Sequence, residues 1–325
     1  MPTAFLTGGA GYIGAHTAKC MANAGWTVIV YDNLERGHRE AVRWGPLIVG
    51  DILDFETLVA AMRMHKPDVV LHFAGLAYVQ ESFEQPDLYQ LVNVTGTAKV
   101  LDAMRIAEVG RLVFSSSCAT YGIPHQTQLC EMHRQCPISP YGWTKLQAEL
   151  LVAEFASRWN ISAIALRYFN AAGCDVAGEL GEDHADEPHV IPRALLNLFE
   201  QCPFTINGSD YPTRDGTAVR DFVHVDDLAT AHLLAAGQVA SSPGMKAYNL
   251  GTQTGYSVAE IVQMINLLSR QKLEIRQGPR RLGDPAALVA DATLARSEMG
   301  WQPRYSDLET IVTTAFQYLS KRRGH

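Results

Sequence analysis

The sequence predicts an α/β fold, with a doubly wound parallel sheet followed by a smaller C-terminal α/β lobe. Short apolar runs alternate with longer amphipathic stretches through the first half of the chain, and a glycine-rich turn follows the first run. Near-continuous apolar strands with helical crossovers indicate a parallel sheet that helices cover on both faces. Functional residues are therefore expected where the strands end, at the carboxyl edge of the sheet.

The strand signals come in a regular order. Apolar strand runs are predicted at residues 4–6, 27–31, 47–49, 69–73, 112–115 and 161–166. Amphipathic helices are predicted at residues 12–24, 55–65, 88–108 and 141–158. This alternation accounts for the large sheet domain.

The regular alternation of strand and helix signals ends after Asn170. Residues 173–192 are polar, acidic and marked by proline, which is typical of a long loop. Short strands are predicted at 204–206 and 248–250, with helices at 257–269 and 306–319. The expected division is a first domain of residues 1–169, to which part of about 218–245 returns, and a second lobe of residues 170–217 and 246–325.

Composition excludes several classes of protein. The 325 residues are 47% hydrophobic and 19% charged, as in a globular protein with ample core. The net charge of −7 comes without a basic block, so no nucleic-acid partner is expected. No apolar run approaches the roughly 20 residues of a membrane span, so no membrane partner is expected.

The cysteines indicate a reducing compartment. None of the six forms a C-x-x-C pair or a zinc-type cluster with histidine, so we expect free thiols and no metal. The glycine-rich turn begins at residue 7, which leaves no room for a signal peptide. The expectation is a cytoplasmic protein.

The glycine-rich turn has the spacing of a phosphate cradle. Gly8, Gly11 and Gly14 form G-x-x-G-x-x-G between a strand and a helix that opens with Tyr12 and Ile13. Glycine permits a tight turn and close backbone approach to a pyrophosphate, and the helix N-terminus offers amide donors. The pattern in this context predicts a Rossmann-type dinucleotide site.

The ends of the next strands complete that site. Asp32, followed by Asn33, ends the second strand, where a carboxylate binds ribose hydroxyls and repels a 2′-phosphate. The cofactor is therefore expected to be NAD rather than NADP. Further cofactor contacts are expected where the third and fourth strands end, at Asp51, Ile52, Phe73, Ala74 and Gly75.

An acid/base pair follows about 130 residues later. Tyr141 and Lys145 are four residues apart and share one helical face. A free tyrosine has a pKa of about 10, so it needs a nearby positive charge to act as a base at neutral pH. Ser117 ends a strand and can supply a hydroxyl where the substrate oxygen and the tyrosine meet. Ser117, Tyr141 and Lys145 are the candidate catalytic residues.

These motifs together resemble a known family. The first half resembles the extended short-chain dehydrogenase/reductase superfamily, through TGGAGYIG at 7–14, HFAG at 72–75, NVTG at 93–96, FSSS at 114–117 and SPYGWTK at 139–145. The second half resembles the UDP-glucose 4-epimerase (UDP-galactose 4-epimerase) family, through RYFNAAG at 167–173, GED at 181–183, DYPTRDGT at 210–217, RDFVHVDDLA at 220–229, YNLG at 248–251 and PRRLGDPA at 279–286.

The resemblance implies an isomerase with tightly bound NAD. In such enzymes the sugar C4 gives a hydride to NAD while the tyrosine, here Tyr141, takes the 4-hydroxyl proton. A 4-keto sugar turns over in the pocket, and the hydride returns to its opposite face, interconverting UDP-glucose and UDP-galactose. By resemblance Ser117 binds the 4-oxygen and Lys145 tunes Tyr141 and holds the nicotinamide ribose. Asn93 and Phe169 are further implied cofactor contacts.

The resemblance also implies a UDP-sugar site. Arg220, Arg281 and Asp284 match positions that hold the diphosphate and the uridine ribose, and guanidinium groups suit phosphate oxygens. The other implied substrate residues are Asn170, His189, Val190, Asn207 and Leu288. Ala77, Asn207 and His189 depart from residues common in the family, which bears on affinity. Leu288 occupies a position that determines pocket size, and its intermediate volume leaves the sugar pair open.

Other activities stay open at this point. The alternatives are an epimerase for UDP-N-acetylglucosamine/galactosamine or UDP-xylose/arabinose, a nucleotide-sugar dehydratase, and a non-catalytic NAD-binding regulator. A dehydratase needs an acidic residue beside the catalytic serine, and none follows Ser117. A regulator would not need the tyrosine and lysine. The resemblance implies a homodimer, and helices 88–108 and 141–158 carry more apolar positions than one sheet face needs.

Overall fold

The central feature of the computed structural model is a parallel sheet. The structure describes residues 1–239 and 243–324, and among these seven strands pair in the order β10-β6-β5-β4-β1-β2-β3. Their bounds are β1 Thr3–Thr7, β2 Thr27–Asp32, β3 Leu47–Val49, β4 Val69–His72, β5 Arg111–Ser117, β6 Ser162–Tyr168 and β10 Gly244–Leu250. Every pairing is parallel. The strand order reverses between β1 and β4, which is where doubly wound sheets bind ligands.

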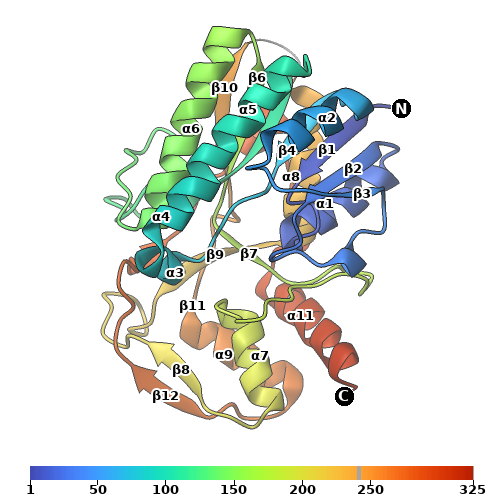
Figure 1. The fold of residues 1–325 in the computed structure, drawn as a ribbon. Coiled ribbons are helices and arrows are strands. Elements are labelled where there is room, and N and C mark those ends of the chain that lie inside the picture. The colour runs from blue at the N-terminus through green and yellow to red at the C-terminus, as the bar shows by residue number, and fades with distance from the viewer. Residues whose placement is uncertain (240–242, 325) are drawn as a thin grey trace.

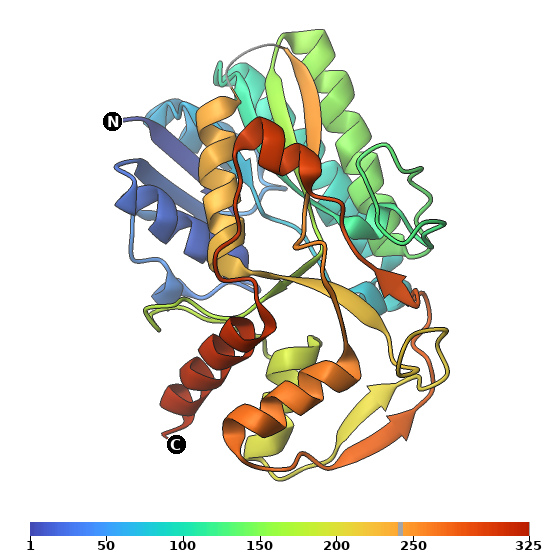
Figure 2. The same ribbon diagram turned by 180° about the vertical axis from the view of Figure 1, so that it is seen from behind.

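Helices cover both faces of this sheet (Figures 1 and 2). One face packs against α1 (Tyr12–Asn23) and α8 (Val225–Gln238), and the other against α2 (Phe55–His65), α5 (Gly96–Ile106) and α6 (Pro140–Trp159). Side-chain caps fix where the helices begin: the Asp54 carboxylate accepts from Thr57 N before α2, and Ser139 Oγ accepts from Gly142 N before α6. The predicted fold class is confirmed.

A smaller lobe lies below the carboxyl edge of the sheet in Figure 1. Its strands are β7 (Asn170–Ala172), β8 (Phe204–Asn207), β9 (Val219–His224), β11 (Gly255–Ser257), β12 (Ile275–Gly278) and β13 (Ala287–Leu288). Strand β9 pairs with β7, β11 and β13, whereas β8 pairs with β12. Helices α7 (Val190–Phe199), α9 (Val258–Ser269) and α11 (Leu308–Arg323) enclose the apolar core of this lobe.

Two element predictions need correction. The stretch 88–108 is not one regular helix: short helices α3 (Val79–Glu84) and α4 (Pro86–Tyr89) lead into a π-helical segment, Gln90–Thr95, before α5. The prediction that 248–250 is a strand of the smaller lobe is wrong. These residues belong to β10, which pairs with β6 at the edge of the central sheet and buries Tyr248 and Leu250 there. The predicted loop ends at His189, because α7 begins at Val190.

The division into two lobes stays a proposal. The pairing of β10 argues for placing Gly244–Leu250 with the central sheet. Helix α10 (Thr293–Met299) also packs on α8 and β10 rather than on the smaller lobe. The segment 218–245, expected to return to the first domain, includes residues 240–242, which lie outside the described residues. In the described ranges no helix has the length and apolar character needed to cross a membrane.

Candidate functional site

A cavity of about 790 Å³ opens at the carboxyl ends of the sheet strands and extends to the smaller lobe. That volume is in the range of small-molecule and cofactor sites. Nearly all the residues predicted for the site line it: Gly8, Gly11, Tyr12, Ile13, Gly14, Asp32, Asn33, Asp51, Ile52, Phe73, Ala74, Gly75, Ser117, Tyr141, Lys145, Phe169, Asn170, His189, Val190, Arg220, Arg281, Asp284 and Leu288. Asn93 and Asn207 do not line the cavity, but each contacts a residue that does, Leu76 and Arg281 respectively.

The glycine turn fits the phosphate cradle predicted from its spacing. Gly8 has φ of +72°, and a Cβ there would lie 2.4 Å from Ala74 N. A Cβ on Gly14 would lie 2.4 Å from Gly8 O, so glycine is what allows α1 to approach the turn. Gly11 faces the cavity, and a Cβ there would meet only Gly8 O, at 3.4 Å. The residues present therefore fit a dinucleotide pyrophosphate at the start of α1.

Asp32 ties the glycine turn to the end of β2. Its carboxylate accepts hydrogen bonds from Ala10 N and Leu34 N, each at 2.9 Å. Burial raises the pKa of Asp32, while these two backbone bonds oppose the rise. Next to it, Asn33 Nδ2 donates to Asp51 Oδ2 at 3.0 Å, which joins the ends of β2 and β3. A carboxylate at this place suits ribose hydroxyls.

Asn93 supports the cavity floor from the second layer. Its Oδ1 accepts from Leu76 N at 2.8 Å, and its Nδ2 donates to Leu76 O and to Thr144 Oγ1, both at 3.0 Å. Asn93 lies in the π-helical segment, a wider turn that often marks functional sites. It thereby joins the segment after β4 to α6.

The candidate catalytic residues converge from β5 and α6. Ser117 is the last residue of β5, and Tyr141 and Lys145 lie on consecutive turns of α6. All three are buried against the cavity wall. Lys145 Nζ donates to Ser115 O at 2.9 Å, and Ser117 Oγ accepts from Ala119 N at 3.1 Å. The sequence placed these groups on one strand end and one helix face, and the fold brings them together.

The charge states of this trio depend on burial. Burial raises the pKa of Tyr141 to about 12, although a hydrogen bond with Ser117 opposes the rise. Burial lowers the pKa of Lys145 to about 8, and Glu149 opposes that fall. The expectation that positive charges lower the pKa of Tyr141 concerned Lys145 together with the nicotinamide ring, so it stays a prediction for the protein with NAD bound. In the chain by itself, the desolvation of the phenol is the largest influence on the pKa of Tyr141.

The opposite wall carries the arginines. Arg220 pairs with the Asp284 carboxylate and donates from Nη2 to Pro285 O at 2.7 Å. Arg281 donates from Nε to the Asn207 amide oxygen at 3.0 Å once that amide is oriented to satisfy both groups. Asn207 thus contacts an arginine of the site rather than the cavity itself. Two anchored guanidinium groups are suited to a diphosphate.

Leu288 both lines the cavity and belongs to a buried apolar cluster. It lies on β13, opposite Arg220 of β9, and is 8% exposed. It packs in a small apolar cluster with Cys118, Tyr121 and Phe169 and also lines the cavity. Asn170 begins β7, immediately after Phe169, and lines the cavity on the same side.

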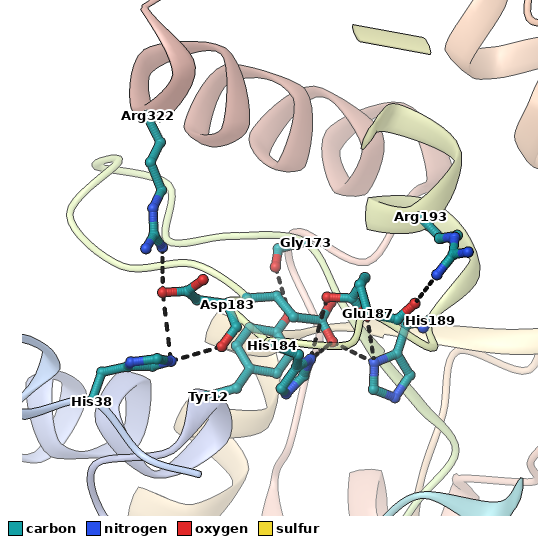
Figure 3. A network of polar contacts seen from close by, with 10 residues as sticks. Tyr12, His38, Gly173, Asp183, His184, Glu187, His189, Arg193 and Arg322 are labelled. Carbon is teal, nitrogen blue, oxygen red and sulfur yellow. Dashed lines mark hydrogen bonds and ion pairs between the residues drawn. The ribbon is translucent and has the colours of Figure 1, made fainter. Parts of the chain in front are cut away.

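The sequence analysis missed a cluster of charged side chains at the cavity. Glu182 and His184 line it beside His189, and the Glu187 side chain is buried. Figure 3 shows His184, Glu187 and His189 close together. Burial alone would lower the pKa of His189, but the Glu182 and Glu187 carboxylates outweigh it and raise that pKa to about 10. The spacing H-x-x-E-x-H at 184–189 could have indicated this cluster from the sequence. The segment that contains it was interpreted only as a loop.

Comparison with known proteins agrees with this geometry. Residues 4–251 match the family model described as the NAD dependent epimerase/dehydratase family. The chain belongs to this family. It is 44% identical to the UDP-glucose 4-epimerase of Rhizobium leguminosarum bv. trifolii over 324 residues, covering 99% of each chain.

Solved structures of relatives carry the same fold. The UDP-glucose 4-epimerase of Brucella ovis, in complex with NAD, is 47% identical with a TM-score of 0.95, covering 98% of each chain. The enzyme of Stenotrophomonas maltophila, with bound NAD and formylated UDP-arabinopyranose, is 34% identical with a TM-score of 0.94 over 100% of each chain. The residues matched to the epimerase/dehydratase family include the glycine turn, Ser117, Tyr141, Lys145 and Arg220, whereas Arg281, Asp284 and Leu288 follow them.

Proposed function

We propose that this protein is a UDP-glucose 4-epimerase that interconverts UDP-glucose and UDP-galactose with a resident NAD. One observation carries the proposal. Ser117, Tyr141 and Lys145 meet in a single cavity whose one side is a glycine cradle and whose other side holds Arg220 and Arg281. A dinucleotide and a nucleotide sugar can thus be held with their reactive ends at the same tyrosine. Relatives at 44% and 47% identity bear the name of this activity.

The cofactor would be held from several strand ends. The residues proposed to hold it are those of the glycine turn, Asp32, Asn33, Asp51, Ile52, the 73–75 segment, Lys145 and Phe169, with Asn93 acting through Leu76. NAD, when bound, supplies a reversible hydride acceptor for the sugar C4. Its positive nicotinamide ring would also favour the phenolate form of Tyr141.

The protein side chains move the proton and hold the sugar. Tyr141 would accept the proton of the 4-hydroxyl and later return it, acting as general base and then as general acid. Ser117 would donate a hydrogen bond to the 4-oxygen and keep it next to the phenol. Because burial raises the pKa of Tyr141 to about 12 in the chain alone, its base form needs the positive charges that assemble around it.

The diphosphate would bind the arginine wall. Arg220 is held by Asp284 and by Pro285 O, so its guanidinium needs little ordering on binding. Arg281, whose guanidinium contacts Asn207, would contribute the second guanidinium group to the diphosphate. Asn170, His189 and Val190 would complete the enclosure of the sugar and nucleotide.

A second activity has one observation in its favour. Leu288 lines the cavity and is smaller than an aromatic residue, so the wall leaves space for a larger 2-substituent. We therefore propose weaker epimerase activity on the UDP-N-acetylglucosamine/galactosamine pair. Preference for the unsubstituted pair follows because leucine still fills part of the wall within a packed cluster.

The decisive experiment omits the cofactor. Purified protein is incubated with each UDP-sugar separately, without added NAD, and the anomeric signals are followed by NMR. We expect UDP-glucose and UDP-galactose to approach the same equilibrium mixture from either side. Conversion of UDP-glucose to a 4-keto-6-deoxy product would instead identify a dehydratase, and NAD binding without turnover would identify a regulator.

We also propose a homodimer in the cytoplasm. Trp143 and Leu150 lie seven residues apart on α6 and are 49% and 62% exposed, and Leu91 is 45% exposed on the adjoining π-helical segment. Figure 1 shows α5 and α6 side by side on one outer face of the molecule. An apolar face of paired helices suits an isologous contact. The six cysteines are free, as a reducing compartment requires.

A further inference from the structure

Four side chains of one segment direct ligand atoms at a common point. Glu182, His184, Glu187 and His189 each offer one oxygen or nitrogen atom, and these four atoms all lie within 4.8 Å of one another. Figure 3 shows both imidazoles and the Glu187 carboxylate turned toward each other in the loop before α7. Two carboxylates and two imidazoles form a donor set that zinc proteins use.

The spacing between these atoms is close to that of a tetrahedral site. His184 Nδ1 lies 3.4 Å from Glu182 Oε1 and 3.3 Å from Glu187 Oε2. His189 Nδ1 lies 2.6 Å from Glu182 Oε1 and 3.1 Å from Glu187 Oε1. Metal–ligand bonds of about 2.0–2.1 Å imply edges of about 3.3 Å in a tetrahedron. Three of the four distances are near that value, and the two imidazoles approach different oxygens of the Glu187 carboxylate.

An independent observation concerns Glu182. Its Oε1 atom is buried, and its close polar neighbours include the two imidazoles, with His189 Nδ1 at 2.6 Å and His184 Nδ1 at 3.4 Å. The Glu187 side chain is also buried, at 5% exposure. Two buried carboxylates carry two negative charges that need compensation, which protonated His184 and His189 supply as ion pairs when no metal is bound. A divalent cation would replace these protons and supply both positive charges at once, with the neutral imidazoles and the carboxylates as its ligands.

We propose that Glu182, His184, Glu187 and His189 form a binding site for one divalent transition-metal ion of the Zn²⁺ class. Imidazole nitrogen with carboxylate oxygen favours Zn²⁺, Co²⁺ or Ni²⁺ over Mg²⁺ and Ca²⁺, which prefer oxygen alone. The sequence analysis predicted no metal because it looked only for metal sites that contain cysteine. The ligands here are spaced along a single loop.

The surroundings supply an entrance and a second layer of contacts. Glu182, His184 and His189 line the cavity, so an ion can reach the site from solvent. The ring of Tyr78 packs edge-on against His184 and His189, with centroids 5.5 and 6.2 Å away. Such contacts fix ring orientation around metals. An ion here would fasten the loop after β7 to His189, the residue that precedes α7.

The test uses the full chain without a histidine tag. After treatment with a chelator and removal of the chelator, ZnCl₂ is titrated by calorimetry at neutral pH in two buffers of different protonation enthalpy. We expect about one ion per chain, micromolar or tighter affinity, and proton release as the histidines give up their protons. The temperature of unfolding should rise with ZnCl₂, since the folded state alone holds the site.

Variants separate this site from surface binding. Glu187→Gln and His184→Gln should each weaken Zn²⁺ binding at least about tenfold, whereas His38→Gln, a histidine beside Asp183 outside the four ligands, should not. CoCl₂ supplies the spectroscopic probe, because a tetrahedral site gives intense visible bands and thiolate ligation adds a near-ultraviolet band. Absence of Zn²⁺ uptake, unchanged affinity in both variants, or a thiolate band would each overturn the proposal.

Discussion

Lys145 Nζ donates a hydrogen bond of 2.9 Å to the carbonyl oxygen of Ser115. Ser115 lies two residues before Ser117 on β5, and Lys145 lies one helical turn after Tyr141 on α6. This single bond therefore fixes the register between the strand that carries the serine and the helix that carries the tyrosine. Burial is the largest influence on the pKa of the neighbouring Tyr141, which it raises to about 12.

The first prediction concerns Tyr141. Tyr141→Phe should lower turnover by about 10²–10⁴, because a positioned general base typically contributes that factor. Bound NAD should persist, since the ring and its packing against Tyr89 are kept. Coupled-assay kcat and the nucleotide content of the variant are measured together. Lys145→Met should be comparably damaging, and retention of more than about a third of wild-type turnover in Tyr141→Phe would show that another group is the base.

The second prediction is that NAD co-purifies with the protein and depends on Asp32. Asp32→Ala removes a carboxylate that accepts from Ala10 N and Leu34 N, so it should weaken NAD binding and reduce discrimination against NADP. Nucleotide released by denaturing the pure protein is quantified, and affinities for both cofactors follow from calorimetry. Glu56→Ala, on the exposed side of α2, is the control. Full activity in nucleotide-free protein would contradict the proposed cofactor role.

The third prediction concerns acid stability. Burial lowers the pKa of His16 and of His232 to about 4 and of His72 to about 3, below the usual 6.5. The unfolded chain therefore binds more protons than the folded chain between those values, so stability rises with pH from about 4 to 6.5 and is lost as pH falls.

The His16→Gln variant isolates one of these groups. The variant lacks one group that takes up a proton on unfolding. The slope of the unfolding free energy against pH should therefore fall by up to about 1.4 kcal/mol per pH unit. Urea unfolding at pH 7, 6 and 5 measures it, with His125→Gln as the exposed control. An identical slope in His16→Gln and wild type would mean that His16 is protonated in the folded state.

The fourth prediction concerns Leu288 and the choice of sugar. Leu288→Tyr should reduce activity on the N-acetylated pair selectively, because overfilling a pocket costs about 1–3 kcal/mol, or roughly 10- to 100-fold. Leu288→Cys should raise that activity. The ratio of kcat/KM values for the two sugar pairs is the measurement. Equal loss of both activities in Leu288→Tyr would assign Leu288 to packing alone, which its cluster with Cys118 and Tyr121 also allows.

The fifth prediction concerns assembly. Light scattering should give about 71 kDa, twice the 35.7 kDa of one chain. Leu150→Lys should shift the protein toward the monomer, since it places a charge in the proposed apolar contact on α6. Leu267→Lys is the matched control, because Leu267 is 71% exposed on α9 in the other lobe. A wild-type monomer at micromolar concentration would refute the dimer.

Local signals account for much of what could be predicted. The strand runs of the sheet, the glycine cradle and the pair Tyr141 and Lys145 are encoded by residues close in sequence, where hydrophobic period and helical spacing act directly. The strand-end position of Asp32 is also local, because parallel strands place their carboxyl ends at one edge. The sequence by itself therefore determined the fold class, the cofactor cradle and the acid/base pair.

Only the tertiary structure decided the long-range pairings. β10 lies beside β6 because seven backbone positions pair there, which no local pattern in 244–250 distinguishes from a strand of the smaller lobe. Arg220 is fixed by Asp284, 64 residues away, and Lys145 by Ser115 O, 30 residues away. The cluster of Glu182, His184, Glu187 and His189 forms because a loop folds back on itself before α7. Such contacts depend on which surfaces the packed core brings together, a property that sequence spacing does not contain.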